Sequence, residues 1–453
     1  MPPLLTLHVT PNATRLPLVD QPCLLYLLLE TEIEGVRDTA VPVNLSLILD
    51  VSESMRVRLV SKGQFTELAD QGLAQEIMVD GVPVWQIQNV PAARASHFPR
   101  KLDFVLAALR ALAEQLRPSD QLSLVAFAER ADLLLPTTPA QDKDAIAQAE
   151  RALARANLGD DTNMHLGMKL ALAEVRGHTR PDVVNRLLLL TDGFTRSAAA
   201  CWSQMAQAQL AGVAISTLGM GGEFNEELLI PLAEQTGGRA YFVEDPAQLP
   251  DLFRQELTAV QAITYRRAEL KLHLTPGVEL RRVYRVRPLL GTIPIDPDPA
   301  GSYTIPLGDI PATSPPALLL ELIAPPRPAG QYRLAQVLLS SDPVGAGRQT
   351  ARQDVVVTVN AGGTGPLNGR VMNIVERVTA FNLQTRALAD AKAGDLTAAT
   401  RKLQAAATRL LDMGEVELAQ TIQQQAAHIS QSTPLTAVAT KRLRYQTGVS
   451  RET

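Results

Sequence analysis

Cysteine is scarce in this sequence of 453 residues, in which Cys23 and Cys201 are the only two. Two cysteines in so long a chain exclude a disulfide framework and favour a reducing compartment. The N-terminus also lacks a basic segment followed by an apolar one, so we expect no secretory signal. Together these absences predict a cytoplasmic protein.

Long apolar runs and a strong excess of one charge are absent as well. The longest runs, Cys23–Leu29 and Leu187–Leu190, are far shorter than the roughly 20 residues that a membrane-spanning helix needs. The 43 basic and 47 acidic residues give a formal net charge of -4, without the basic excess typical of nucleic-acid binding. Because 46% of the residues are hydrophobic, we expect two or three folded domains, with no membrane span and no nucleic-acid partner.

The motifs of common enzyme classes are missing too. The sequence contains no His-Glu-x-x-His zinc motif, no phosphate-binding glycine loop and no serine-hydrolase elbow. Gly219-Met-Gly-Gly222 follows a predicted strand, but no Lys-Ser/Thr comes after it, so a connecting loop is favoured. The six histidines are scattered, and His165 is better interpreted as a surface residue than as a general base. We therefore expect a binding protein rather than an enzyme, with metal-dependent hydrolysis as an alternative.

Strands and helices alternate between residues 43 and 264. Continuous Val/Ile/Leu strands between amphipathic helices are typical of a doubly wound, mostly parallel α/β sheet that helices cover on both faces. Ligands of such a fold bind beyond the carboxyl ends of its strands. The predicted strands are 44–49, 121–127, 131–135, 186–190, 213–218 and 239–243, and the predicted helices are 101–116, 140–155, 166–175, 198–211, 226–236 and 246–264.

The pattern changes after Tyr265, where short strands are separated by segments rich in Pro and Gly. This pattern predicts an antiparallel β-sandwich over residues 265–361, with a linker at 291–301. Two further strands are predicted within residues 1–42. Our hypothesis is that they complete the sandwich and that the α/β domain is inserted into it, although they could instead belong to the α/β sheet.

The C-terminal part, residues 370–446, is predicted to be a helical domain with a basic tail. Gly394 and Gly414 separate its helices, and each is followed by an acid that suits a helix N-terminus. Ala-rich faces resemble tetratricopeptide-like hairpins, but without a clean repeat a plain helical bundle is favoured. The predicted helices are 371–393, 396–411 and 416–430.

Acids and hydroxyls gather at three predicted strand or loop ends. Asp50-Val-Ser52-Glu-Ser54 leaves the first strand of the α/β domain, Thr162 precedes a helix, and Asp192 ends an apolar strand. Alone, Asp192-Gly would be an ordinary turn and Thr162 a helix N-cap. Their order and spacing together indicate a site for a hard divalent cation, because Mg²⁺ prefers oxygen ligands.

This arrangement resembles the von Willebrand factor type A domain and its metal-ion-dependent adhesion site, which uses Asp-x-Ser-x-Ser, then a Thr, then a strand-end Asp. The resemblance implies that Ser52 and Ser54 ligate the metal directly, and Thr162 directly or through water. Asp50 and Asp192 would supply negative charge, mostly through water. The metal would be Mg²⁺, with Mn²⁺ or Ca²⁺ as alternatives, and one coordination position would receive an Asp or Glu of a partner protein.

The resemblance also bears on partners. The order of domains is similar to that of bacterial proteins of this family, which implies a scaffold or adaptor of an intracellular complex. An accessory subunit of an AAA-type ATPase or chelatase-like machine is the alternative.

Two features depart from the family's pattern. Glu53, Asp160 and Asp161 stand where small residues are common, and they point either to the metal or, as we favour, to solvent. Residues 56–99 form an insertion with a hairpin predicted at Asp80-Gly81. The insertion could form a partner-binding rim, pack beside the site without a role in it, or offer one of its acids to the metal. Those acids are Glu67, Asp70, Glu76 and Asp80.

Overall fold

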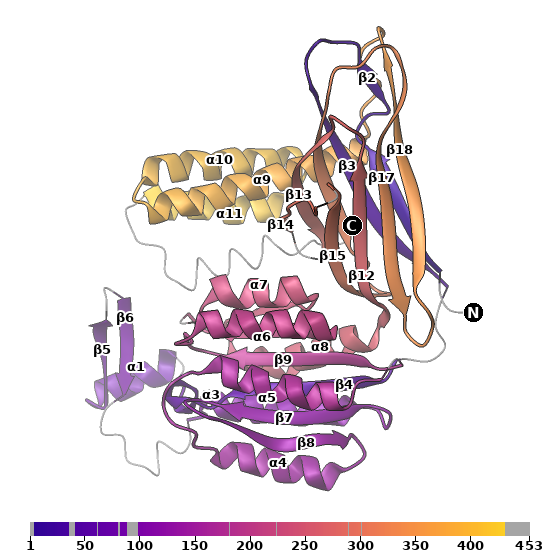
Figure 1. The fold of residues 1–453 in the computed structure, drawn as a ribbon. Helices are drawn as coiled ribbons and strands as arrows, with labels where there is room; N and C mark the ends of the chain where they lie inside the picture. The colour runs from indigo at the N-terminus through magenta and orange to yellow at the C-terminus, as the bar shows by residue number, and fades with distance from the viewer. Residues whose placement is uncertain are drawn as a thin grey trace. The chain divides into compact units, whose positions relative to one another are not determined.

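The computed structural model describes residues 4–35, 41–60, 62–79, 82–87, 98–180, 182–222, 224–288, 290–299 and 301–430. The chain forms two compact units (Figure 1). One unit is essentially the continuous segment Val41–Gln261, and the other is built mainly from Met1–Ala40 and Ala262–Leu435.

The first unit is built on a six-stranded sheet with the order β11-β10-β9-β4-β7-β8. All neighbouring strands are parallel except β7 and β8. Every residue of β4, β9 and β10 is buried, as expected for central strands that are covered on both faces. The strands are β4 Val43–Asp50, β7 Gln121–Phe127, β8 Ala131–Pro139, β9 Val184–Thr191, β10 Ala214–Met220 and β11 Ala240–Val243.

Helices cover both faces of this sheet. Ser216 Oγ donates to Glu256 on α8, while Thr217 Oγ1 donates to the carbonyl of Leu229 on α7. Consecutive side chains of a strand point to opposite faces, so α7 and α8 lie on opposite sides of β10. The helices are α3 Lys101–Gln115, α4 Lys143–Arg155, α5 Met164–Gly177, α6 Ala198–Ala211, α7 Glu226–Thr236 and α8 Leu249–Gln261.

The predicted closing helix was too long at its C-terminal end. It ends at Gln261, and β12 begins at Ile263. Ile263, Thr264 and Tyr265 are buried, and such β-branched and aromatic residues favour a strand.

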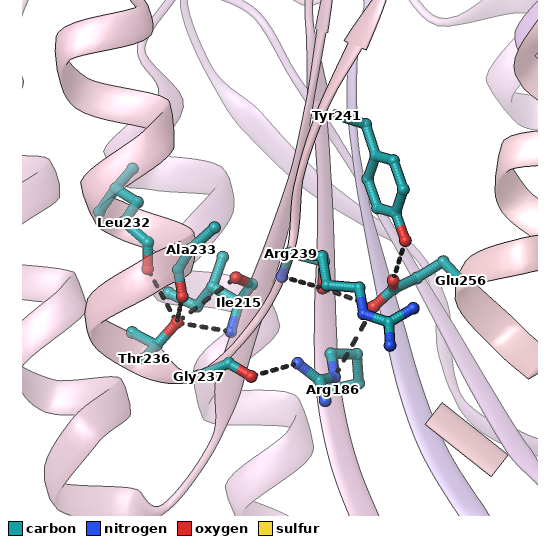
Figure 2. A network of polar contacts seen from close by, with 10 residues as sticks. Arg186, Ile215, Leu232, Ala233, Thr236, Gly237, Arg239, Tyr241 and Glu256 are labelled. Carbon is teal, nitrogen blue, oxygen red and sulfur yellow. Dashed lines mark hydrogen bonds and ion pairs between the residues drawn. The ribbon is translucent and has the colours of Figure 1, made fainter. Parts of the chain in front are cut away.

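A buried polar network ties α8 to the sheet (Figure 2). Glu256 is 1% exposed, and its carboxylate accepts hydrogen bonds from Ser216 Oγ at 2.5 Å and Tyr241 OH at 2.7 Å. Arg186 Nε lies 3.9 Å from the same carboxylate, and its guanidinium also donates to the carbonyl of Gly237. Burial, and then the Glu256 charge, hold the pKa of Tyr241 well above its usual range, so the phenol stays a donor.

The insertion after β4 contains a helix that the sequence analysis did not predict. This helix is α1 Lys62–Asp70. The insertion also contains the hairpin strands β5 Ala74–Val79 and β6 Val82–Ile87. Phe65, Leu68, Ala74 and Phe98 form its small core. Val79 pairs with Val82, which is the register predicted for a two-residue turn, and the turn itself lies outside the described residues.

The second unit contains a sandwich of two five-stranded sheets, with the orders β1-β3-β16-β13-β14 and β15-β12-β17-β18-β2. β3 pairs with β16 and β2 with β18, so the N-terminal strands belong to the sandwich and not to the α/β sheet. Residues 291–301, predicted as a linker, include the short strand β14. The strands are β1 Leu4–Pro11, β2 Arg15–Pro17, β3 Cys23–Glu34, β12 Ile263–Leu274, β13 Glu279–Arg287, β14 Gly291–Ile293, β15 Tyr303–Pro311, β16 Ala317–Ala324, β17 Gly330–Pro343 and β18 Gln349–Asn360.

Three antiparallel helices complete this unit. α9 Gly369–Lys392 packs Val371, Val375 and Val378 against β3, β13 and β16, and its C-terminal half shares a core with α10 Leu396–Asp412 and α11 Val416–Ser430. The predicted basic tail lies outside the described residues. Within the described part of the chain, no helix is long and apolar enough to cross a membrane.

Candidate metal site

Parallel pairing brings the three predicted segments to one edge of the α/β sheet. β4 ends at Asp50 between β7 and β9, and Leu49 pairs with Leu190 just before Thr191. Asp192 therefore emerges beside Asp50. The segment that carries Thr162 is fixed to the same edge, because Asn163 N donates to the carbonyl of Ala128 at 2.8 Å.

Asp50 is fully buried and held on both carboxylate oxygens. Its Oδ1 accepts from the backbone N–H of Ser52 at 2.9 Å, and its Oδ2 accepts from Thr191 Oγ1 at 2.6 Å. Burial is the main cause that raises the pKa of Asp50 to about 6, and the nearby Asp192 adds to it, while the hydrogen bonds from Thr191 and Ser52 oppose it. The protein thus holds a charge-bearing group where ionisation is unfavourable.

The two serines and Asp192 form a hydrogen-bonded chain. Ser52 Oγ lies 3.1 Å from Ser54 Oγ, which donates to Asp192 Oδ1 at 2.6 Å. The other oxygen, Asp192 Oδ2, accepts from Lys101 Nζ at 2.5 Å. These contacts link Ser52, Ser54 and Asp192 one after another and place the ammonium group of Lys101 beside Asp192.

Thr162 completes the predicted set. It is 9% exposed, and a Cβ built on Gly193 would lie 3.4 Å from Thr162 Oγ1. The hydroxyl therefore lies against the residue that follows Asp192. The structure brings Asp50, Ser52, Ser54, Thr162 and Asp192 together at one strand edge.

The acids that departed from the family's pattern lie at the rim of this site. Asp161 pairs with Arg196 at 2.6 Å, and Asp160 lies 3.7 Å from Arg56. The same arginines tie the loops together, because Arg56 donates to the carbonyls of Val51 and Gly159, and Arg196 N donates to that of Thr162 at 3.3 Å. Glu53 is exposed.

The acidic side chains of the insertion that the structure describes are those of Glu67 and Asp70. Both are exposed on α1, and Glu67 accepts a hydrogen bond from Gln71. Asp80 and the side chain of Glu76 lie outside the described residues. The charged side chain that the structure does place on Asp192 is basic, Lys101.

Two residues at the site were not predicted. Thr191 is the last residue of β9 and directly precedes Asp192, so its hydroxyl could have been expected to contact a residue at the same edge of the sheet. The sequence did not indicate that Lys101 lies near the site, because the insertion separates it from Ser54. Its proximity to Asp192 depends on how that insertion closes.

Gly167 lets α5, the helix that follows Thr162, approach the sheet. A Cβ on this residue would lie 2.8 Å from Ile48 Cγ2 and 3.0 Å from Phe127 Cδ1. We expect Gly167→Ala to lower the free energy of unfolding by about 1–3 kcal/mol, because both neighbours are fully buried and must shift. Urea unfolding of this variant and of Gly177→Ala, which meets nothing within 4 Å on the same helix, measures the difference. Equal stabilities would contradict the close approach.

The donor set suits a hard cation. It offers three hydroxyls and two carboxylates, which are the oxygen ligands of Mg²⁺ and Ca²⁺ rather than the Cys and His ligands of Zn²⁺. Among the described residues, no group of three or more His, Cys, Asp or Glu is placed to hold a metal ion. A metal site at this edge therefore depends on its serine and threonine hydroxyls.

Known families match two segments of the chain. The model of the von Willebrand factor type A domain matches residues 94–255, and that of the Sll0103-like, C-terminal alpha-helical domain matches residues 369–449. The chain is 26% identical over 315 residues to the uncharacterized protein sll0103 of Synechocystis, which covers 68% of this chain and 74% of the relative.

Solved structures share the fold over nearly the whole chain. A von Willebrand factor type A protein from Catenulispora acidiphila superposes with a TM-score of 0.75 at 17% identity, covering 99% of this chain and 98% of the other. The ArnB paralog VWA2 from Sulfolobus acidocaldarius has a TM-score of 0.57 at 14% identity, covering 98% of each chain. These likenesses confirm the predicted α/β fold and the helical C-terminal part. Residues 94–255 are therefore identified as a von Willebrand factor type A domain and residues 369–449 as an Sll0103-like C-terminal helical domain, in a chain whose fold is that of a solved von Willebrand factor type A protein.

Proposed function

We propose that this protein binds a divalent cation at the edge of the α/β sheet and uses it to bind an acidic side chain of a partner protein. The observation that carries the proposal is the hydrogen-bonded chain from Ser52 through Ser54 to Asp192, with a cation, Lys101, at its end. Buried hydroxyls and carboxylates that converge on a positive charge are suited to hold a metal ion.

Each residue has a role in this proposal. Ser52, Ser54 and Thr162 would hold the cation through neutral hydroxyls, while Asp50 and Asp192 would supply negative charge. Mg²⁺ is the expected ion, with Mn²⁺ and Ca²⁺ as alternatives. Because few charged ligands neutralise it, the bound cation would supply a Lewis-acidic position that attracts an outside Asp or Glu.

Type A domains commonly mediate protein interactions, which supports a binding role over an enzymatic one. We propose that the protein is a scaffold or adaptor of a bacterial cytoplasmic complex. The alternative is that it is an accessory subunit of an AAA-type ATPase, which would then be its partner. The sandwich and the helical part, which form a separate unit, would offer a second surface for the same complex.

Metal binding is the first test. We expect Ser52→Ala to weaken Mn²⁺ binding about 100-fold, because removing even an outer-shell partner of a metal typically costs 10- to 100-fold in affinity. Electron paramagnetic resonance of free Mn²⁺ measures the dissociation constant. Ser46→Ala is the matched control, since Ser46 lies on β4, the strand that ends two residues before Ser52, is fully buried, and has an Oγ without a hydrogen-bond partner among the described residues. Equal Mn²⁺ affinity of the wild-type protein, Ser52→Ala and Ser46→Ala would contradict a metal site at Ser52.

Partner binding is the second test. A partner captured from a bacterial lysate should be released by EDTA and lost with Asp192→Ala. Capture that is indifferent to both would refute metal-mediated binding. Phosphoester hydrolysis by the purified protein, lost in Asp50→Ala, would favour the enzyme alternative instead.

A further inference from the structure

Lys101 is the first residue of α3 and lies in ion-pair contact with the candidate metal site. Its Nζ is 2.5 Å from Asp192 Oδ2; the Asp192 side chain is 0% exposed and that of Lys101 is 20% exposed. The first turn of a helix disfavours cations, because the helix dipole is positive there. An ammonium group at this position therefore needs another source of stabilisation, and the buried carboxylate supplies it.

The insertion returns the chain so that Lys101 reaches this place. Lys101 N donates to the carbonyl of Val57 at 3.2 Å, and Leu59 N donates to that of Pro99 at 2.8 Å. An isolated bridge also pairs Arg58 with Arg100. The insertion thus leaves and rejoins the domain at nearly the same point, so α3 starts directly beside the loop of Ser52 and Ser54.

We propose that Lys101 is a tethered competitor for the metal, whose ammonium neutralises Asp192 when no metal is bound and leaves when a divalent cation enters. This inference rests on the proposed function, because it needs the metal site. It gives the insertion a role that none of the sequence-based alternatives included: positioning an internal cation rather than an internal acid.

Electrostatics supports an exchange rather than joint occupancy. Asp50 and Asp192 are both buried, and a buried carboxylate without a compensating charge is costly. The ammonium meets this need in the metal-free protein. A divalent cation bound by the same residues would repel an ammonium a few ångströms away, and the flexible four-carbon stem of lysine lets Nζ move outward.

Metal affinity tests the proposal directly. We expect Lys101→Met to bind Mn²⁺ at least about tenfold more tightly than the wild-type protein, a change of about 1.4 kcal/mol. Lys101→Arg, which keeps the charge, should stay close to wild type. Lys143→Met is the matched control, because Lys143 is likewise the first residue of a helix, α4, but its Nζ donates to the carbonyl of Ala113.

The outcomes separate this inference from the proposed function. Equal or weaker Mn²⁺ binding by Lys101→Met would overturn the competitor role and leave the metal site intact. If neither protein bound Mn²⁺, the proposed function would fail and the competitor role with it. Tight binding by the variant alone would support both.

A second measurement needs no variant, in case Lys101→Met does not fold. Acetylation of lysine amines, quantified by peptide mass spectrometry, reports how accessible each ammonium group is. We expect the rate at Lys101 to rise several-fold when Mn²⁺ is added to the EDTA-treated wild-type protein, while the rate at Lys143 stays constant. An unchanged or slower rate at Lys101 with bound Mn²⁺ would overturn the proposal.

Discussion

Asp50→Asn should stabilise the metal-free protein at pH 8 by up to about 3 kcal/mol. Burial raises the pKa of Asp50 from 3.8 to about 6, and each unit of this difference corresponds to about 1.4 kcal/mol at a pH where the group is ionised. Asn fits the same hydrogen bonds, because its oxygen can accept from Ser52 N and its amide can donate to Thr191 Oγ1, a hydroxyl that also accepts.

The sign of this effect depends on pH. A carboxyl whose pKa is raised by folding favours the folded state fully below its unfolded pKa of 3.8, and this contribution is lost as the pH rises through about 6. The advantage of Asp50→Asn should therefore be present at pH 8, shrink below pH 6 and vanish near pH 4.

Urea unfolding in EDTA between pH 4 and pH 8 measures this advantage. Asp182→Asn, which also removes one carboxylate but from an exposed position, is the control. If Asp50→Asn were less stable than wild type at every pH, the raised pKa of Asp50 would be contradicted. The expected result would show that the metal-free domain keeps a destabilising charge at Asp50, which a metal-binding role explains.

The site residues could be predicted because they follow continuous apolar strands. A run such as Leu187–Leu190 identifies a central strand, and parallel pairing then brings the residues after it to one edge. Asp50 and Asp192 were found for this reason, and the order of the motif added Thr162. The sandwich strands were found as short strands separated by Pro- and Gly-rich segments.

Other features depend on tertiary contacts that leave no local pattern. α1 was missed because its sequence is polar and its apolar residues, Phe65 and Leu68, pack only on the small core of the insertion. The contact of Lys101 with Asp192 depends on the closure of that insertion. Arg186 lies in a strand predicted as a continuous apolar one, and nothing in that run indicates its buried carboxylate partner, Glu256 on α8.

The buried network around Glu256 stabilises the α/β domain. We expect Glu256→Gln to lower the free energy of unfolding by about 3 kcal/mol, because removing one partner of a buried charge network leaves the other charge uncompensated. Ser216 and Tyr241 both donate to the carboxylate of Glu256, and an amide offers a single acceptor oxygen in its place. The guanidinium of Arg186, 3% exposed, would also lose this negative charge.

Asp251→Asn provides the comparison on the same helix. Asp251 lies 3.4 Å from Arg254, with side chains 81% and 50% exposed, and exposed pairs of this kind contribute about 0–1 kcal/mol. Urea unfolding of both variants at one pH should separate them by about 2 kcal/mol or more. If Glu256→Gln proved as mild as Asp251→Asn, the contacts of Glu256 would not be what holds α8 on the sheet. A large loss would show that the buried carboxylate of Glu256 helps to hold α8 on the sheet, in addition to the buried apolar side chains of the helix.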